Sequence, residues 1–173
     1  MKKIILIIGI IMSIILVINK KEEIILIPNE AIRVRVIANS YNKEDINIKE
    51  ELKDMLNSEL NLLLDGINNI NDVRTTINNN LDFINSFVDK SLKKLNLNTS
   101  FTLNYGKNYF PKKEFNGVIY NDGLYESLVI TLGEGKGPNY WCVLYPPICS
   151  IENEKGNNFE YKFYIKEIID KYL

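Results

Sequence analysis

The sequence predicts an α+β domain in which an antiparallel sheet is covered by an αα-hairpin, preceded by an N-terminal signal or anchor helix. Two observations lead to this prediction. Before residue 100, two long stretches carry apolar residues at helical spacing after one short strand pattern. From Ser100 onward, apolar and polar residues alternate, and Gly or Asn separates the alternating runs. Helices and strands in separate blocks are typical of α+β domains.

The chain begins with the pattern of an export signal. Two lysines precede a fifteen-residue apolar stretch, Ile4–Ile18, and no small-residue cleavage motif follows it. We therefore expect residues 1–21 to be either a cleaved signal peptide or a membrane anchor that enters the membrane through residues 4–18. The protein would accordingly be secreted or membrane-anchored. Residues 22–30 then form a tether, and residues 31–173 form a single exported domain.

A first strand and two helices open the exported domain. Ala31–Ala38 alternates apolar residues with two arginines, which predicts a strand with both guanidinium groups on one face. Asn42 is placed to cap a helix that runs to the break at Asp65-Gly66. A second long helix is expected from Ile70 to Leu95, so that the pair forms the hairpin.

The second half of the domain predicts four strands and a tail. The strands are Phe101–Tyr105, Val118–Tyr120, Leu124–Leu132 and Tyr140–Tyr145. Glu126 falls on the apolar face of the third strand. It therefore lies either at an exposed strand end or buried against a cation such as Arg33 or Arg35. The tail, Asn158–Leu173, alternates over Phe159, Tyr161 and Phe163, which predicts a strand, and ends in a short helix.

Composition excludes several classes of protein. The net charge is -1; without the four lysines of the first 21 residues, the 21 basic residues fall to 17 against 22 acidic ones. An acidic domain lacks the basic surface that nucleic-acid binding needs. The chain has no His, which excludes Ser-His-Asp and Cys-His catalysis and argues against a zinc site built from two Cys. We expect no enzyme activity, metal, cofactor or small-molecule substrate.

The segment Gly133–Cys149 is the strongest candidate for a functional site, because it holds the only Trp, both Cys and three of the five Pro. Three glycines in its first five residues predict a loop that needs backbone freedom or close approach. The loop lacks the spacing and the Ser or Thr of a phosphate-binding loop. It is either a plain turn between strands or a protein-contact loop that offers Glu134 and Lys136 to a partner.

The aromatic and cysteine residues behind this loop leave two questions open. Trp141 is either a core residue or an interface residue, since Trp is enriched at the centres of interfaces. Cys142 and Cys149 form a candidate disulfide, because an even number of cysteines in an exported domain favours pairing. Alternatively, the stiff Pro146-Pro147 between them holds the sulfurs apart.

Several segments together resemble one family. The segment GEGKGPNYWCVLYPPIC at residues 133–149 resembles the signature of the stage II sporulation protein R family. YFPKKEFNGV at residues 109–118 and Tyr125-Glu126 resemble the family's FPTK-type turn and YEAL strand, and residues 32–40 resemble its RVIANS strand. Tyr140 stands where the family usually has a Trp.

The resemblance implies a signalling protein of endospore-forming bacteria. Such a protein is exported from the forespore into the intermembrane space. There it triggers a membrane-embedded aspartic protease of the mother cell, which processes the precursor of sigma factor E.

From residue chemistry, we expect two groups of residues to matter. The partner contacts are Glu134, Lys136, Asn139, Tyr140 and Trp141. A supporting polar cluster is formed by Arg33, Arg35, Asn39 and Glu126. Two other functions compete with signalling. One is a cell-envelope hydrolase that acts on peptidoglycan through Glu126 and Glu134, and the other is an envelope scaffold with no signalling role.

Overall fold

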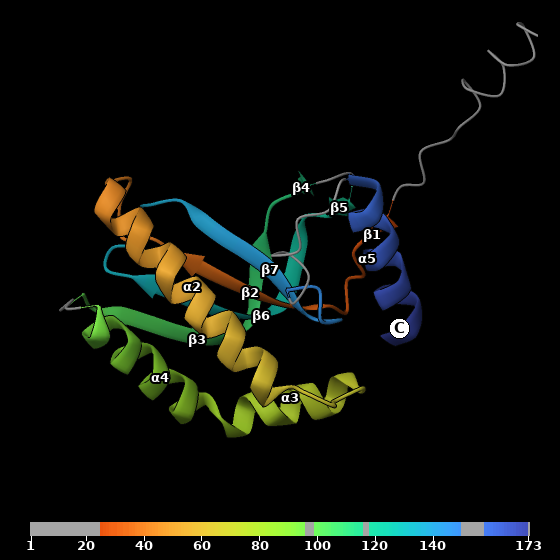
Figure 1. Cartoon of the computed structure of the whole chain (residues 1–173), viewed down its shortest axis with the longest axis horizontal. Helices are drawn as coiled ribbons and strands as arrows, with labels where there is room; N and C mark the ends of the chain where they lie inside the picture. The colour runs from red at the N-terminus through yellow and green to blue at the C-terminus, as the bar shows by residue number, and fades with distance from the viewer. Residues whose placement is uncertain (1–24, 96–98, 116–117, 150–157, 173) are drawn as a thin grey trace, which may run out of the picture.

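The computed structural model describes residues 25–95, 99–115, 118–149 and 158–172 (Figure 1). The predicted signal or anchor, residues 1–21, lies outside these residues. Within the part of the chain that is described, no helix is long and apolar enough to cross a membrane.

A four-stranded sheet in the order β3-β6-β2-β7 forms the centre of the domain. Its strands are β2 (Ile32–Ile37), β3 (Phe101–Phe110), β6 (Gly123–Leu132) and β7 (Asn139–Tyr145). The outer pairs are antiparallel, but the central pair β2 and β6 is parallel, so the sheet is mixed rather than wholly antiparallel as predicted. Alternation along a strand indicates which face is buried, and it carries no information on strand direction.

Three helices cover one face of this sheet (Figure 1). They are α2 (Lys43–Leu63), α3 (Ile70–Asn79) and α4 (Leu81–Lys94). The second helix of the predicted hairpin is therefore two helices, divided at Asn80. This residue leaves the helical conformation, with φ -114° and ψ 14°, and its side-chain amide donates to the Thr76 carbonyl at 2.8 Å. The apolar stripe continues across the break, which is why the periodicity predicted one helix.

The start of α2 matches the prediction in position but not in capping contact. Asn42 occupies the N-cap position, and no side-chain hydrogen bond caps the helix. Instead, the Ser40 hydroxyl accepts a hydrogen bond from the Asn42 N–H at 3.1 Å and donates one to Asp45. Glu44 and Asp45 lie in the first turn, where the helix dipole favours carboxylates.

A smaller sheet and the last helix lie beside the main sheet (Figure 1). The small sheet has the order β1-β5-β4, with β1 (Ile25–Leu26), β4 (Lys113–Phe115) and β5 (Val118–Tyr120). Ile27 follows β1 and is buried, so part of the predicted tether packs into the folded domain.

The tail is a single helix, α5 (Asn158–Tyr172), so the predicted strand over Phe159, Tyr161 and Phe163 is wrong. Ile165 is buried, and Ile168 and Ile169 pack beside it on the second hydrophobic cluster. Spacings of three and four residues in the later part of the segment favour a helix. They outweigh a three-residue alternation at its start.

The segment after β7 is closed by a disulfide between Cys142 and Cys149, whose Cα atoms lie 5.6 Å apart. Both residues are buried. Because the two sulfurs are bonded, the proline pair does not hold them apart. The Tyr145–Pro146 peptide bond in this turn is cis.

Candidate functional site

The loop between β6 and β7 is tied to the segment that follows β2. Asn39 accepts a hydrogen bond from the Glu134 N–H through its side-chain oxygen, at 2.9 Å, and another from the Lys136 N–H through its backbone carbonyl, at 2.9 Å. Its side-chain amide donates to the Asp45 carboxylate at 3.0 Å. One asparagine thus joins the loop to the first turn of α2, and the loop is held in place.

Two glycines allow this close packing. Gly133 has φ +52°, and a Cβ there would overlap the Asn39 side chain. A Cβ at Gly137 would overlap the backbone carbonyl of Ser40. Of the two reasons that the sequence offered for the glycines, close approach accounts for both positions, and the positive φ adds a second requirement at Gly133.

Glu134 and Lys136 project from this fixed loop. Their charged atoms lie 2.6 Å apart, and their side chains are 70% and 73% exposed. An ion pair so exposed contributes little to stability. Both charges can therefore leave each other for a partner at little cost.

Trp141 and Asn139 lie on the face of the sheet that α2, α3 and α4 do not cover. The Arg35 Nε donates to the Asn139 side-chain oxygen at 2.8 Å, and the guanidinium lies 5.9 Å from the centre of the Trp141 ring. The Lys113 ammonium lies 5.3 Å from the same ring. Trp141 is half-buried, and the cations of Arg35 and Lys113 both lie near its ring.

Arg33 lies on the same face as Arg35, as predicted, but is only 1% exposed. Its guanidinium lies 4.1 Å from the Phe110 ring centre, with Tyr120 and Tyr125 at 5.5 and 4.8 Å. Two of its nitrogens, Nε and Nη1, have no hydrogen-bond partner among the described residues. Burial lowers the pKa of this guanidinium to about 10, so it stays charged at neutral pH.

Tyr140 points to the opposite face, toward α2. Its hydroxyl accepts a hydrogen bond from the Asn57 side-chain amide at 2.8 Å, and the Lys53 ammonium lies 5.2 Å from its ring centre. Of the predicted partner contacts, Asn139 and Trp141 share one face, Glu134 and Lys136 share the loop, and Tyr140 packs against a helix.

The predicted supporting cluster is not a single cluster. Glu126 lies on the helix-covered face, where it accepts hydrogen bonds from the Arg74 Nε at 2.6 Å and the Tyr105 hydroxyl at 2.7 Å. Its cation is therefore Arg74 of α3, and neither arginine of β2 contacts it. Burial and this hydrogen bond raise the pKa of Tyr105. Glu126 holds a helix on the sheet, whereas Asn39 holds the loop.

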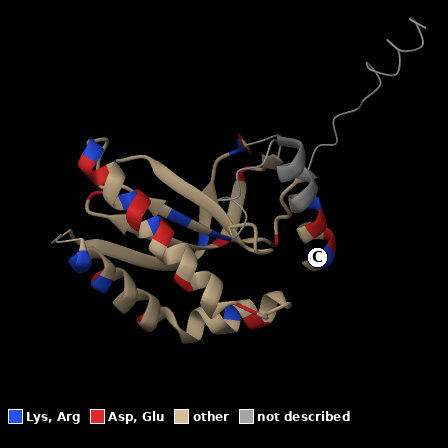
Figure 2. Cartoon of the chain, in the orientation of Figure 1, with Lys and Arg blue, Asp and Glu red and all other residues tan. Residues whose placement is uncertain are grey.

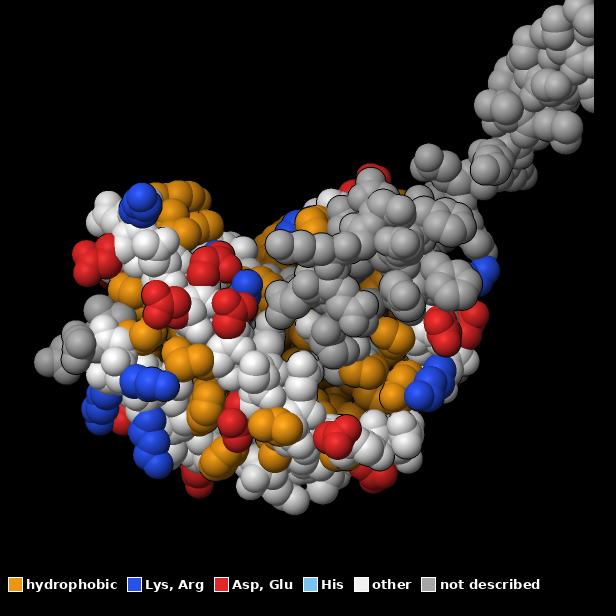
Figure 3. Space-filling model, in the orientation of Figure 1, with side chains coloured by type: hydrophobic (Ala, Val, Ile, Leu, Met, Phe, Trp, Pro, Cys, Tyr) orange, Lys and Arg blue, Asp and Glu red, His pale blue; other side chains and the backbone are white. Residues whose placement is uncertain are grey.

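Charged residues are also numerous on α2. Acidic and basic positions are interspersed along α2, while β2 carries basic positions only (Figure 2). Figure 3 shows acidic and basic side chains gathered over α2 on the helix-covered face.

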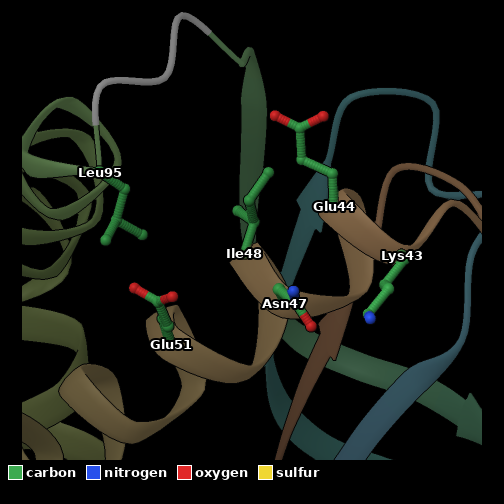
Figure 4. Close-up of a pocket in the computed structure, with 6 residues that line it drawn as sticks. All are labelled: Lys43, Glu44, Asn47, Ile48, Glu51 and Leu95. Carbon is green, nitrogen blue, oxygen red and sulfur yellow. The ribbon is translucent and has the colours of Figure 1, made fainter.

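A hollow of about 500 Å³ lies beside the start of α2, with Leu95 at its far wall (Figure 4). Its lining residues are Lys43, Glu44, Asn47, Ile48, Glu51 and Leu95. None of the predicted site residues lines it.

Two residues of the Trp141 surroundings were missed by sequence reasoning. Lys113, in β4 of the small sheet, and Phe110, the last residue of β3, both lie near the Trp141 ring, with the Phe110 ring centre 6.1 Å away. Both belong to the YFPKKEFNGV segment that carried the family resemblance. That segment was the available signal, but nothing local indicated that it approaches Trp141.

The fold and this geometry define an α+β domain with a rigid charged loop and an adjoining sheet face of aromatic and cationic side chains. Among the described residues, no three Cys, Asp or Glu side chains are grouped to hold a metal ion.

Comparison with known proteins then gives the family. Residues 28–155 match the family described as stage II sporulation protein R, and the chain belongs to this family. It is 35% identical over 132 residues to the stage II sporulation protein R of Bacillus subtilis (strain 168). The matched part is 76% of this chain and 59% of that relative, so the chain spans about three fifths of the relative's length. No solved structure matches the chain significantly.

Proposed function

We propose that this protein is an extracytoplasmic sporulation signal that activates a membrane-embedded aspartic protease, which then processes the precursor of sigma factor E. In this proposal it is exported from the forespore into the intermembrane space and acts as a ligand rather than as an enzyme. Family membership supports a role in sporulation. A ligand activates its receptor by binding the active state more tightly than the inactive one.

The observation that carries the contact role is the loop Gly133–Pro138. Its backbone is fixed through Asn39, while Glu134 and Lys136 are exposed and paired only with each other among the described residues. A preorganised loop loses little conformational entropy on binding, so its charges can contribute to affinity. Trp141, three residues after this loop, adds an aromatic side chain next to it in the sequence.

The test removes both loop charges and follows precursor processing in sporulating cells. Glu134→Ala with Lys136→Ala should lower processing about tenfold, the effect of losing one to two kcal/mol at an interface. Asp89→Ala with Lys93→Ala is the matched control. It removes another exposed ion pair, 2.6 Å long, from α4. Unchanged processing in the loop variant, at normal protein abundance, would refute the contact role.

The competing hydrolase needs two carboxylates about 5–10 Å apart. Glu126 lies near the start of β6 and Glu134 just beyond its end. Eight residues at about 3.3 Å each put roughly 20 Å or more between them along a strand. Glu126 is also engaged by Arg74 and Tyr105. This geometry disfavours the pair as a glycosidase centre and leaves signalling as the better-supported function.

The third candidate, an envelope scaffold, is separated from signalling by a deletion of the gene. If the protein is the signal, unprocessed sigma factor precursor should accumulate. A scaffold would instead give misshapen envelopes with normal processing. Reconstitution of the full chain with the protease and the precursor then asks whether the effect is direct.

A further inference from the structure

The main sheet has two edge strands among the described residues, β3 and β7. Among the described residues, β7 pairs with β2 alone. The Ala38 N–H donates to the Pro138 carbonyl at 3.2 Å, which makes Ala38 and Pro138 a hydrogen-bonded pair. Hydrogen-bonded and non-hydrogen-bonded pairs alternate along an antiparallel ladder. The register Ile37–Asn139 and Arg35–Trp141 therefore turns the backbone N–H and C=O groups of Asn139 and Trp141 away from β2.

The same alternation is visible further along β7. Val143 is the next residue of this set, and its carbonyl accepts a hydrogen bond from the Cys149 N–H at 3.1 Å, on the side away from β2. The disulfide-closed turn thus covers the later part of the edge. No described backbone group pairs with the outward groups of Asn139 and Trp141, so the open part of the edge is Asn139–Trp141.

The side chains around this edge are cationic. Arg35 and Lys113 both lie against the Trp141 ring, and neither forms an ion pair with a described carboxylate. Residues 22–173 carry 17 basic and 22 acidic residues, so two cations at one ring without a described carboxylate partner differ from the overall charge balance of this part of the chain. A residue placed opposite Trp141 on a neighbouring strand would have its side chain on the same face as the ring and these two cations.

We propose that Asn139–Trp141 binds an extended segment of a partner polypeptide as an added β-strand, with an Asp or Glu of that segment opposite Trp141. The outward backbone groups supply hydrogen bonds, and the charge of Arg35 and Lys113 selects the carboxylate. The inference deepens the proposed function and rests on it for the existence of a protein partner.

One pair of variants tests the backbone hydrogen bonds. Asn139→Pro removes the outward N–H, while the bonds between β2 and β7 do not use this group. Proline is tolerated at such positions of edge strands. Asn139→Ala removes the same side chain, and with it the Arg35 contact, but keeps the N–H. Binding should therefore be weaker, by about tenfold, in the Pro variant than in the Ala variant.

A second pair tests the charge and does not depend on a proline being accepted. Lys113→Glu places a carboxylate at the Trp141 ring. Lys112→Glu makes the same change at the neighbouring exposed residue, outside the proposed site. The first variant should bind an acidic segment at least about tenfold more weakly than the second.

The probe is an end-blocked peptide of alternating Thr and Val with one central Glu, and its counterpart with a central Lys. The full chain, in mild detergent, is titrated with each peptide while amide hydrogen exchange is measured residue by residue. The Glu peptide should slow exchange at Asn139 and Trp141 and bind more tightly than the Lys peptide. Unprotected amides at saturating peptide, or equal binding by the Pro and Ala variants, would overturn strand addition. Equal binding of the two peptides would overturn the proposal that the partner segment carries an Asp or Glu opposite Trp141.

Precursor processing in cells, measured on the same variants, separates this inference from the proposed function. If the peptide protects both amides while gene deletion leaves processing intact, strand addition stands and the protease role fails. If processing needs the protein but the amides stay unprotected and the Pro variant signals like the Ala variant, the protease role stands and strand addition fails.

Discussion

Arg33 is a buried cation with aromatic rings around it and no carboxylate among its described partners. A buried charge is costly to desolvate, and a well-packed apolar residue of similar volume often replaces it at no loss. Arg33→Met should therefore leave the free energy of unfolding within about 1 kcal/mol of the parent. Arg33→Ala should lower it by about 3 kcal/mol, because a cavity remains. Urea unfolding of both variants measures the difference, and a large loss in the Met variant would reveal a charge partner of Arg33.

At Gly137 there is no space for any side chain. A Cβ there would overlap the Ser40 carbonyl, whereas one at Gly106 would meet only the Asn104 side-chain oxygen, at 4.0 Å. Gly137→Ala should therefore lower the free energy of unfolding by about 1–3 kcal/mol, the usual cost of overpacking. Gly106→Ala is the matched control and should cost less. Thermal unfolding of the two variants compares them, and equal stabilities would contradict the close approach of the loop to Ser40.

At the residue scale, sequence reasoning identified positions better than contacts. Sequence reasoning singled out the loop glycines, Asn39 and Trp141, but it did not predict that Asn39 holds the loop. The partner of Glu126 was wrong, because Arg74 is 52 residues away and its approach depends on where α3 packs. A side chain on a known face still needs the placement of other elements before its contacts can be assigned.

At the scale of the elements, a disulfide closes the turn that follows β7. The bond between Cys142 and Cys149 closes eight residues, which on the chain-entropy estimate stabilises the fold by about 2.5 kcal/mol. Cys142→Ala with Cys149→Ala should lower the free energy of unfolding by about that amount. A reductant should lower the stability of the parent similarly and leave the variant unchanged. If reductant leaves the parent unaffected, the bond is absent in solution.

Element boundaries show what periodicity can and cannot predict. The strand at Val118–Tyr120 has the predicted bounds, and β6 and β7 each differ from prediction by one residue at the start. The division of the second helix at Asn80 was missed, because a local side-chain hydrogen bond does not interrupt an apolar stripe. The direction of β2 relative to β6 was also beyond prediction, since long connections decide it.

At the scale of the whole molecule, the two faces of the main sheet differ in the elements and side chains that lie on them. The helix-covered face holds the larger hydrophobic cluster, which contains Val34, Leu128 and Leu52. Of the described elements, the small sheet and α5 cover part of the other face, which carries the aromatic and cationic side chains near Trp141. The α+β class followed from the order of the patterns. The order of the patterns did not predict which elements cover the second face, because that depends on how the later segments fold back onto the sheet.

The stability of the whole domain should fall in alkaline solution. Burial raises the pKa of the phenols of Tyr105, Tyr125 and Tyr145 above the value of 10.0 for a free phenol. Above about pH 10 the unfolded chain therefore loses protons that the folded chain keeps, and raising the pH favours unfolding. Arg33 acts in the opposite direction, since burial lowers its pKa to about 10 on folding. One guanidinium offsets at most one of the three phenols, so the net effect is a loss.

Alkaline unfolding followed by circular dichroism, with phenolate absorbance recorded on the same samples, measures this effect. The phenolate signal of the three residues should rise together with unfolding rather than before it. Tyr105→Phe removes one of the three protons and should make the loss of stability with pH less steep. Its contact with Glu126 is also lost, so the slope with pH, and not the stability at neutral pH, is the quantity to compare. Complete phenol ionisation near pH 10 in a domain that is still folded would contradict the burial of these hydroxyls.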